Sequence, residues 1–201
     1  IDLNKLKFKF CKMHNREDGR ETYKSKLKCA RSSNYDLYLS LFEVLDNSSS
    51  TGVESKNIKV KLYVDDDGLY KIMVEDDGNG IKNILETAAH GYYRERDDTE
   101  GNEFGHGDKA AAINISDKLI MFSKCKKGEY QRAIWDQKDM SNEDRYLPKY
   151  SITNCEEFNE YKDFKNKGTI SIYENLRENT IRSFDLNKLK LMMEKRYKYW
   201  I

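Results

Sequence analysis

The sequence EDDGNGI at residues 75–81 carries the strongest structural signal in this chain. It follows directly on a segment with strand character at residues 69–75. Its two glycines allow the backbone to turn tightly and to approach a ligand closely. Asp-Gly and Asn-Gly pairs are also ordinary turn signals, so this segment alone does not establish a site. Three other segments, placed before and after it, give it a specific meaning.

Length and composition set the frame for these segments. A chain of 201 residues with 38% hydrophobic residues can form one domain with its own core. Lys and Arg total 36 against 35 for Asp and Glu, which gives a net charge of +1. No overall field therefore favours nucleic acid or an acidic membrane as a partner. We expect a single domain over residues 1–201.

The four cysteines favour a reducing compartment. Cys11, Cys29, Cys125 and Cys155 form no C-x-x-C pair and no metal-like cluster with the histidines. No apolar run approaches the ~20 residues that span a bilayer, and the first residues lack the apolar core of a signal peptide. We expect an intracellular protein, nuclear or cytoplasmic, with no membrane partner. The missing initiator Met and the abrupt end at Ile201 suggest a piece of a longer protein.

Hydrophobic periodicity predicts the order of helices and strands. A helix begins after a cap at Asn34 or Asp36, because four aliphatic residues follow at helical spacing. Residues 58–64 and 69–75 alternate around a turn and predict a hairpin. The other predicted elements are a strand at 6–10, a helix at 81–90, a helix at 108–115, strands at 118–123, 130–136, 150–154 and 169–174 around a polar insertion, and a closing helix beyond Ser183.

This order predicts an α+β fold. We expect a two-layer sandwich in which a mixed, mostly antiparallel sheet is covered by helices on one face. Within the domain, residues 1–33 form an N-terminal strand and polar segment, and 34–176 form the core. Residues 177–201 form a closing helix that leads to a following domain. The polar, aperiodic stretch at 91–102 predicts a loop that can close over a ligand.

Glu43 and Asn47 lie four residues apart on the first predicted helix and therefore project from the same side. A carboxylate there can orient or deprotonate an attacking water. An amide oxygen one turn later can complete the shell of a magnesium ion that also binds phosphate oxygens and water. Most Glu and Asn residues on helices are simply solvated, so this pair gains weight only from the other segments.

A glycine loop precedes the Ala-rich helix at 108–115. Its sequence is GHGDK at residues 105–109. Backbone N–H groups and a helix N-terminus can face an anion here, which suits a triphosphate. Lys109 can add a positive charge, although a lysine in a first helical turn is more often exposed to solvent. His106 is not favoured as a metal ligand or acid–base group, because the other two histidines have no spacing relation to it.

Together, and in this order, the segments resemble the four nucleotide-binding boxes of the GHKL ATPases, which share the Bergerat ATP-binding fold. The fourth segment is Gly168 and Thr169 at the start of a predicted strand. The superfamily includes gyrase B, the cytosolic heat-shock chaperone ATPase, histidine kinases, MutL and MORC proteins. The resemblance covers about residues 34–176. It implies that the chain binds ATP or ADP with Mg²⁺ and hydrolyses ATP to ADP and phosphate.

The resemblance also implies roles for residues. Asp76 accepts a hydrogen from the adenine amino group, and Thr169 hydrogen-bonds beside it. Asn47 is the magnesium ligand, and Glu43 is the catalytic residue that acts on the attacking water. The remaining nucleotide-binding residues that it implies are Gly78, Gly80 and Ile81 after Asp76, Gly91 at the start of an ATP lid formed by 91–102, and Gly105, His106, Gly107, Asp108 and Lys109 in the glycine loop.

Three details are most similar to MORC proteins. They are LDN at 45–47, the Gly-x-Gly-x-Lys pattern within 105–109, and GTISIYENL at 168–176. A nucleotide-driven switch of that type implies an ATP-dependent homodimer, with a client protein or nucleic acid engaged through other domains. Ser50 is a departure, since many GHKL hydrolases carry Asp at this place. The departure concerns the water network near the site rather than nucleotide binding.

Two alternative functions stay open. A histidine-kinase-type catalytic domain shares the fold and the nucleotide, although kinase versions typically lack a glutamate at the position of Glu43. No phospho-acceptor helix is visible in this sequence either. A non-hydrolysing ATP-sensing module is the second alternative, and Ser50 is compatible with it. Phosphate release without any protein substrate distinguishes a hydrolase from both.

Overall fold

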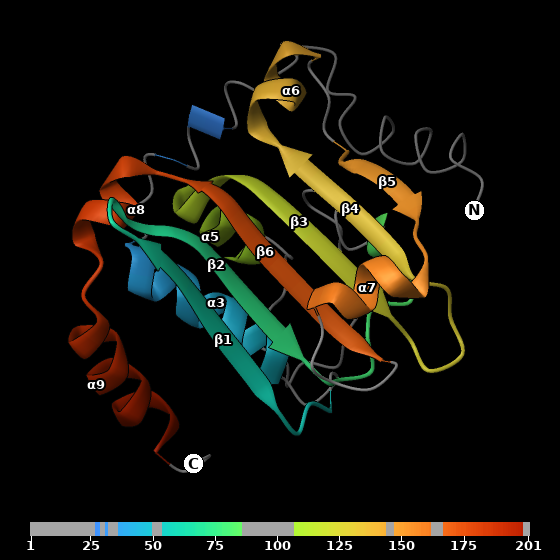
Figure 1. Cartoon of the computed structure of the whole chain (residues 1–201), viewed down its shortest axis with the longest axis horizontal. Helices are drawn as coiled ribbons and strands as arrows, with labels where there is room; N and C mark the ends of the chain where they lie inside the picture. The colour runs from blue at the N-terminus through green and yellow to red at the C-terminus, as the bar shows by residue number, and fades with distance from the viewer. Residues whose placement is uncertain are drawn as a thin grey trace, which may run out of the picture.

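A computed structural model of the chain describes residues 27–28, 31, 36–49, 54–85, 107–143, 147–161 and 167–198. The described strands form one sheet in the order β1-β2-β6-β3-β4-β5 (Figure 1). Their bounds are β1 (Ile58–Asp65), β2 (Gly68–Asp76), β3 (Ser116–Lys124), β4 (Gln131–Asp136), β5 (Lys149–Ile152) and β6 (Gly168–Leu176). Every pairing between these strands is antiparallel. The strand predicted at 6–10 lies outside the described residues.

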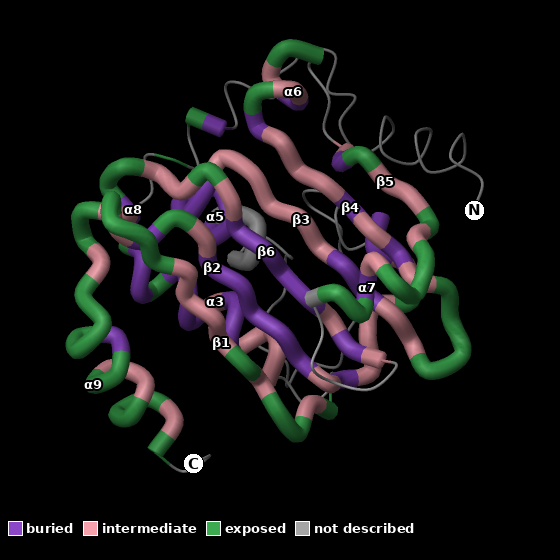
Figure 2. Tube along the Cα trace, viewed as in Figure 1, coloured by how far each residue is buried: buried purple, intermediate pink, exposed green. Residues whose placement is uncertain are grey.

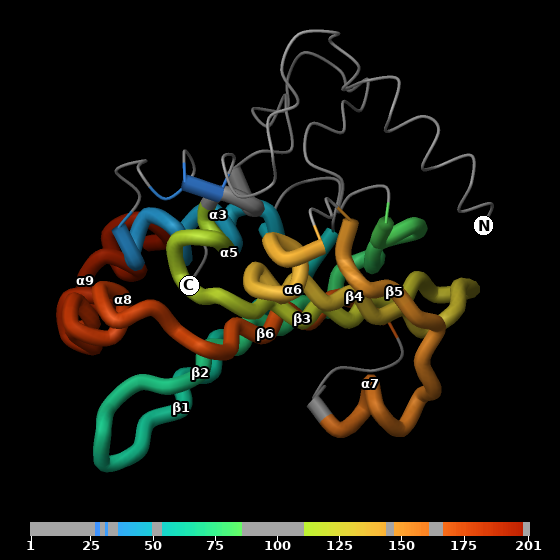
Figure 3. The backbone as a smooth tube through the Cα atoms, turned by 90° about the horizontal axis from the view of Figure 1, so that it is seen from above, coloured from blue at the N-terminus to red at the C-terminus, as the bar shows by residue number. Residues whose placement is uncertain are grey.

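Helices pack on this sheet, which confirms the predicted α+β fold, although they lie on both of its faces and not on one alone. Their bounds are α3 (Leu37–Ser49), α5 (Gly107–Ile115), α6 (Gln137–Asn142), α7 (Cys155–Tyr161), α8 (Glu178–Ser183) and α9 (Leu186–Tyr197). Figure 3 shows α3 and α5 on one side of the sheet and α7 on the other. Asp36 caps α3, because its carboxylate accepts from the N–H of Leu39 at 2.7 Å. Asp185 caps α9 in the same way.

The main core lies between the sheet and α3, α5 and α9. Strand alternation explains its composition, since Ile72 and Val74 of β2 face α3 while Met73 between them faces the other side. Figure 2 shows the buried residues concentrated along α3, β2 and β6. The buried members are Leu37, Tyr38, Leu41, Phe42, Val44, Leu45, Leu69, Ile72, Val74, Ala112, Ile115, Tyr173 and Leu189.

A second core lies on the opposite face of the sheet, under α7. Phe158 of α7 is fully buried there against Met73, Phe122, Ile170 and Ile172. The sequence predicts only a polar insertion at this place, because the seven residues of α7 are mostly polar and include a single Phe. The buried Phe158 ring and an ion pair between Glu157 of α7 and Arg132 of β4 hold this short helix on the sheet.

The predicted helix at 81–90 begins later in the structure. Helical backbone starts at Ile84, and the side chain of Asn83 accepts from the N–H of Leu85 at 3.2 Å. Residues 81–83 are not helical, because the side chains of Ser123 in β3 and Gln131 in β4 form hydrogen bonds with the backbone of Ile81 and Lys82. Residues 86–90 lie outside the described part of the chain.

Helix α8 marks one end of the sheet. A Cβ atom placed on Gly68, at the start of β2, would lie 3.7 Å from Cγ2 of Ile181 in α8. The hydroxyl of Tyr38, in the first turn of α3, donates to the carbonyl oxygen of Ser183 at 2.8 Å. Helix α3 therefore starts at the end of the sheet where β2 starts, and its last turns approach the end of β2.

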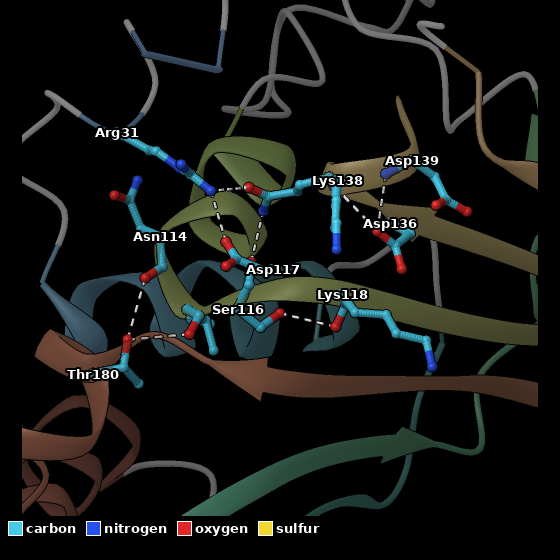
Figure 4. Close-up of polar contacts among 11 residues, drawn as sticks. Arg31, Asn114, Ser116, Asp117, Lys118, Asp136, Lys138, Asp139 and Thr180 are labelled. Carbon is cyan, nitrogen blue, oxygen red and sulfur yellow. Dashed lines mark hydrogen bonds and ion pairs between the residues drawn. The ribbon is translucent and has the colours of Figure 1, made fainter. Parts of the chain in front are cut away.

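Helix α5 runs in the opposite direction to α3. Thr180 of α8 lies within hydrogen-bond distance of the carbonyl oxygens of Asn114, at 3.2 Å, and Ile115, at 3.1 Å, where α5 ends (Figure 4). Arg31 reaches the same region and donates to Asp117 at 2.6 Å. Because α8 holds the C-terminal end of α5, the first turn of α5 points toward the other end of the sheet.

Candidate functional site

Four segments converge at the end of the sheet away from α8. They are the last turns of α3 with Glu43 and Asn47, the end of β2 with Asp76, the first turn of α5, and the start of β6 with Thr169. Helices α3 and α5 pack side by side in the main core. Chain direction alone therefore brings together segments that are far apart in the sequence.

Asp76 is the buried acid of this site. Its side chain continues the face of β2 that carries Ile72 and Val74, so it lies on the side of the sheet covered by α3. The residue is only 4% exposed, and its Oδ1 accepts from the N–H of Gly78 at 3.0 Å and of Thr169 at 3.3 Å. The pairing of β2 with β6 places Asp76 opposite Thr169. The predicted neighbourhood of these two residues is therefore present.

Asp77, the second acid of the pair, has a different task. Its carboxylate accepts from the backbone N–H groups of Lys56 at 2.7 Å and Asn57 at 2.9 Å, and from the Asn57 side chain at 2.8 Å. Partial burial raises the pKa of the Asp77 carboxyl, but the hydrogen bonds from Asn57 and Lys56 outweigh it, so the pKa lies below its usual value. Asp77 thus holds the segment before β1, and Asp76 is the acid turned toward α3.

Gly80 is required by a close approach to β3. Its φ is +71°, and a Cβ atom there would lie 2.1 Å from the carbonyl oxygen of Lys124. Only glycine can take this place without displacing one of the two backbones. Gly80 therefore allows the turn to pack directly against the end of β3. Gly78, two residues earlier, is buried.

Two strand residues that the motifs do not include hold the turn in place. Ser123 of β3 is fully buried, and its Oγ accepts from the N–H of Ile81 at 2.7 Å. The Nε2 of Gln131, in β4, donates to the carbonyl oxygens of Ile81 at 3.0 Å and Lys82 at 3.3 Å, and its Oε1 accepts from the N–H of Ile84 at 3.1 Å. One feature of the sequence could have pointed to Ser123. It follows Leu119 and Met121 at every second position of β3, so it is a polar residue that comes after two apolar side chains on the same strand face.

Glu43 and Asn47 lie one turn apart on α3, and both are half-buried. Asp46 between them turns to α9, where it accepts from Arg196 and from the hydroxyl of Tyr197, the latter at 2.7 Å. Burial and the hydrogen bond to Asp46 raise the pKa of Tyr197. The acid next to Asn47 is therefore used to fix α9 beside α3.

The glycine loop is described only in part. Gly107, Asp108 and Lys109 form the first turn of α5, one residue earlier than predicted. The predicted binding residues Gly91, Gly105 and His106, and the whole of the predicted lid at 91–102, lie outside the described residues.

The chemistry of the gathered groups fits the parts of a magnesium-bound nucleoside triphosphate. A carboxylate such as that of Asp76 accepts hydrogens, as a purine amino group requires. The first turn of α5 presents N–H groups without partners inside the helix, which favour an anion. Magnesium normally takes one or two protein ligands and completes its shell with phosphate oxygens and water, so the amide oxygen of Asn47 suits it.

A protein-family model described as "Histidine kinase-, DNA gyrase B-, and HSP90-like ATPase" matches residues 35–169, about two-thirds of the chain. The match begins just before α3 and ends at Thr169, so it contains all four segments of the site. The chain belongs to this family and is an ATP-binding domain of the GHKL type. No curated protein matches the chain. Within the described residues, no helix has the length and apolar character needed to cross a membrane.

Proposed function

We propose that this domain binds ATP with magnesium and hydrolyses it to ADP and phosphate. The observation that carries the proposal is the arrangement of the site. The α3 turns with Glu43 and Asn47 approach the same end of the sheet as the Asp76–Thr169 pair and the first turn of α5. A base-binding acid, an anion-binding helix terminus and a water-activating carboxylate then lie around one ligand.

Each part of the site has a separate task in this proposal. Asp76 accepts a hydrogen of the adenine amino group, with Thr169 beside it, while Gly78, Gly80 and Ile81 shape the turn next to the base. The backbone N–H groups at Gly107 to Lys109 face the phosphates, and the Lys109 ammonium adds charge there. Gly91, Gly105 and His106 are assigned to the lid and the glycine loop from the sequence alone.

Glu43 acts on water, and Asn47 acts on the metal. The Glu43 carboxylate accepts a proton from the water that attacks the terminal phosphate, which makes the water a better nucleophile. The Asn47 amide oxygen would hold a magnesium ion, which would supply positive charge to offset the negative phosphates. Loss of Asn47 therefore affects binding of the triphosphate, and loss of Glu43 affects turnover only.

Phosphate release by two variants tests these roles. We expect Glu43→Ala to bind ATP like the parent and to hydrolyse it on the order of 10²–10⁴ times more slowly, the usual contribution of a positioned general base. Asn47→Ala is expected to lose magnesium-dependent ATP binding. Glu194→Ala, which removes an exposed carboxylate on α9, serves as the control and keeps both properties. Unchanged hydrolysis in Glu43→Ala would contradict the assignment. Parent protein that binds ATP without releasing phosphate would favour the sensing module, or the kinase if an acceptor protein restores transfer.

We further propose that ATP drives a conformational switch of the MORC type. Binding closes the 91–102 segment and favours a homodimer, which then acts on a client protein or nucleic acid through other domains. The sequence resemblance at 45–47, 105–109 and 168–176 supports this proposal. The mass in solution is measured for the parent protein with a non-hydrolysable ATP analogue and magnesium, and for the Glu43→Ala variant with ATP and magnesium. We expect a dimer in both samples. A monomer in both would refute the switch and leave ATP binding intact.

A further inference from the structure

Ser123 contacts three groups beside the proposed adenine site. Its Oγ lies 2.7 Å from the N–H nitrogen of Ile81, 3.2 Å from the carbonyl oxygen of Gly168 and 3.1 Å from Oγ1 of Thr169. Strands β3 and β6 pair Ser123 directly with Thr169. The same Thr169 donates its backbone N–H to the Asp76 carboxylate at 3.3 Å. Ser123 is therefore connected both to the turn after Asp76 and to the side chain next to it.

The hydrogen supply of these groups fixes the direction of the bonds. A hydroxyl has one proton to donate and two lone pairs that accept. The Ile81 N–H can only donate to Ser123, and the Gly168 carbonyl can only accept from it. Once the Ser123 proton is given to Gly168, its contact with Thr169 is a hydrogen bond only if Thr169 donates. All three contacts are satisfied together in this one arrangement.

We propose that Ser123 is a positioning residue for base selection, because it takes the proton of the Thr169 hydroxyl and leaves that oxygen as an acceptor. This inference rests on the proposed nucleotide site. The base edge near β2 and β6 then meets the Asp76 carboxylate and the Thr169 lone pairs, both of which accept hydrogens. A purine with a 6-amino group supplies them, and a purine with a 6-oxo group presents a third acceptor that is repelled.

Comparison of ATP with inosine triphosphate measures this selection. The two nucleotides share sugar and phosphates, and they differ only at C6 and N1 of the base. In the parent protein, ATP is expected to bind much more tightly. Ser123→Ala frees the Thr169 proton, so the hydroxyl can rotate and donate to a 6-oxo group. The selection ratio is the dissociation constant of inosine triphosphate divided by that of ATP. We expect this ratio to fall about three- to tenfold in Ser123→Ala, which is the contribution of one neutral hydrogen bond.

The ratio separates positioning from simple support of the turn. Loss of the Ile81 bond in Ser123→Ala affects both nucleotides equally and cancels in the ratio. Thr169→Val is expected to lower the ratio by itself, because it removes an acceptor for the amino group, whereas Thr169→Ser keeps it. Adding Ser123→Ala to Thr169→Val is expected to change the ratio no further. Titration calorimetry with magnesium gives all dissociation constants.

The outcomes distinguish this inference from the proposed function. A parent protein that binds neither nucleotide would refute the nucleotide site itself. If the parent binds ATP and the ratio in Ser123→Ala equals the ratio in the parent, only the role of Ser123 is refuted. If Ser123→Ala does not fold, judged by circular dichroism, Thr169→Val still decides the direction of the hydroxyl. A ratio that stays constant or rises in Thr169→Val would show that Thr169 donates in the parent, and the inference would be wrong.

Discussion

Gly80→Ala tests whether the turn after Asp76 is held by its contact with β3. Two costs follow from the structure. The alanine must adopt a φ of +71°, which is unfavourable for residues with a Cβ atom, and its Cβ would lie 2.1 Å from the carbonyl oxygen of Lys124. Real Cβ atoms essentially never come closer than 3.0 Å to such an atom, so one backbone must move.

Both costs have known magnitudes. A left-handed conformation costs about 1–2 kcal/mol for an ordinary residue. Forcing extra atoms into a packed place costs about 1–3 kcal/mol. We therefore expect Gly80→Ala to lower the free energy of unfolding by about 2–5 kcal/mol, a large part of the stability of a typical domain.

Two other glycines are matched controls for the two costs. Gly68 has a φ of +112°, but a Cβ there would meet only Ile181 at 3.7 Å, so Gly68→Ala carries the conformational cost alone. At Gly128 the nearest contact of an added Cβ would be Cβ of Cys125 at 3.3 Å, and we expect a small effect. Urea denaturation gives the order Gly128→Ala, Gly68→Ala, Gly80→Ala from least to most destabilised. Equal stability of the Gly80 and Gly68 variants would refute the close contact with Lys124.

Three further predictions concern Asp76, Asp77 and Phe158. Asp76→Asn is expected to remove the stabilisation by ATP and magnesium, which is about 2.7 kcal/mol at a ligand concentration of a hundred times the dissociation constant. Asp77→Asn is the control and is expected to keep this stabilisation. Thermal melting of both variants with and without ATP measures the difference. Because the pKa of Asp77 is lowered by folding, its charged form stabilises the protein above the usual Asp pKa of about 3.9. The stability difference between parent and Asp77→Asn should therefore be constant from pH 7 to 5 and shrink below about pH 4, as urea titrations can show; a difference that grows on acidification would contradict this. Phe158→Ala is expected to lower the free energy of unfolding by about 3–5 kcal/mol, because Phe158 is fully buried. Glu160→Ala changes an exposed residue of the same helix and is expected to have almost no effect. Equal effects of the two substitutions in urea denaturation would show that Phe158 does not anchor α7.

Local patterns explain why most elements could be predicted. The apolar stripe of α3, the hairpin of β1 and β2 and the Ala-rich α5 each follow from residues close in sequence, and the structure confirms them. The same holds for the antiparallel α+β architecture. Helix α7 and the delayed start of the helix after Ile81 were not predicted, because each depends on contacts with another strand: Phe158 with the sheet, and Ile81 with Ser123 and Gln131.

The sequence by itself determined the family of this protein, since the family's boxes are short segments whose residue types and order are visible without a structure. The family resemblance assigned Asp76, and not Asp77, to the base, but the contacts of the two acids could not be predicted from the sequence. Tertiary structure decided that Asp76 is buried beside Thr169 while Asp77 binds the segment before β1. Tertiary structure also placed Ser123 between Ile81 and Thr169, which are 42 and 46 residues away from it in sequence. The physical reason is that side-chain partners in a sheet depend on which strands pair and in which register, and neither is set by the residues of one strand alone.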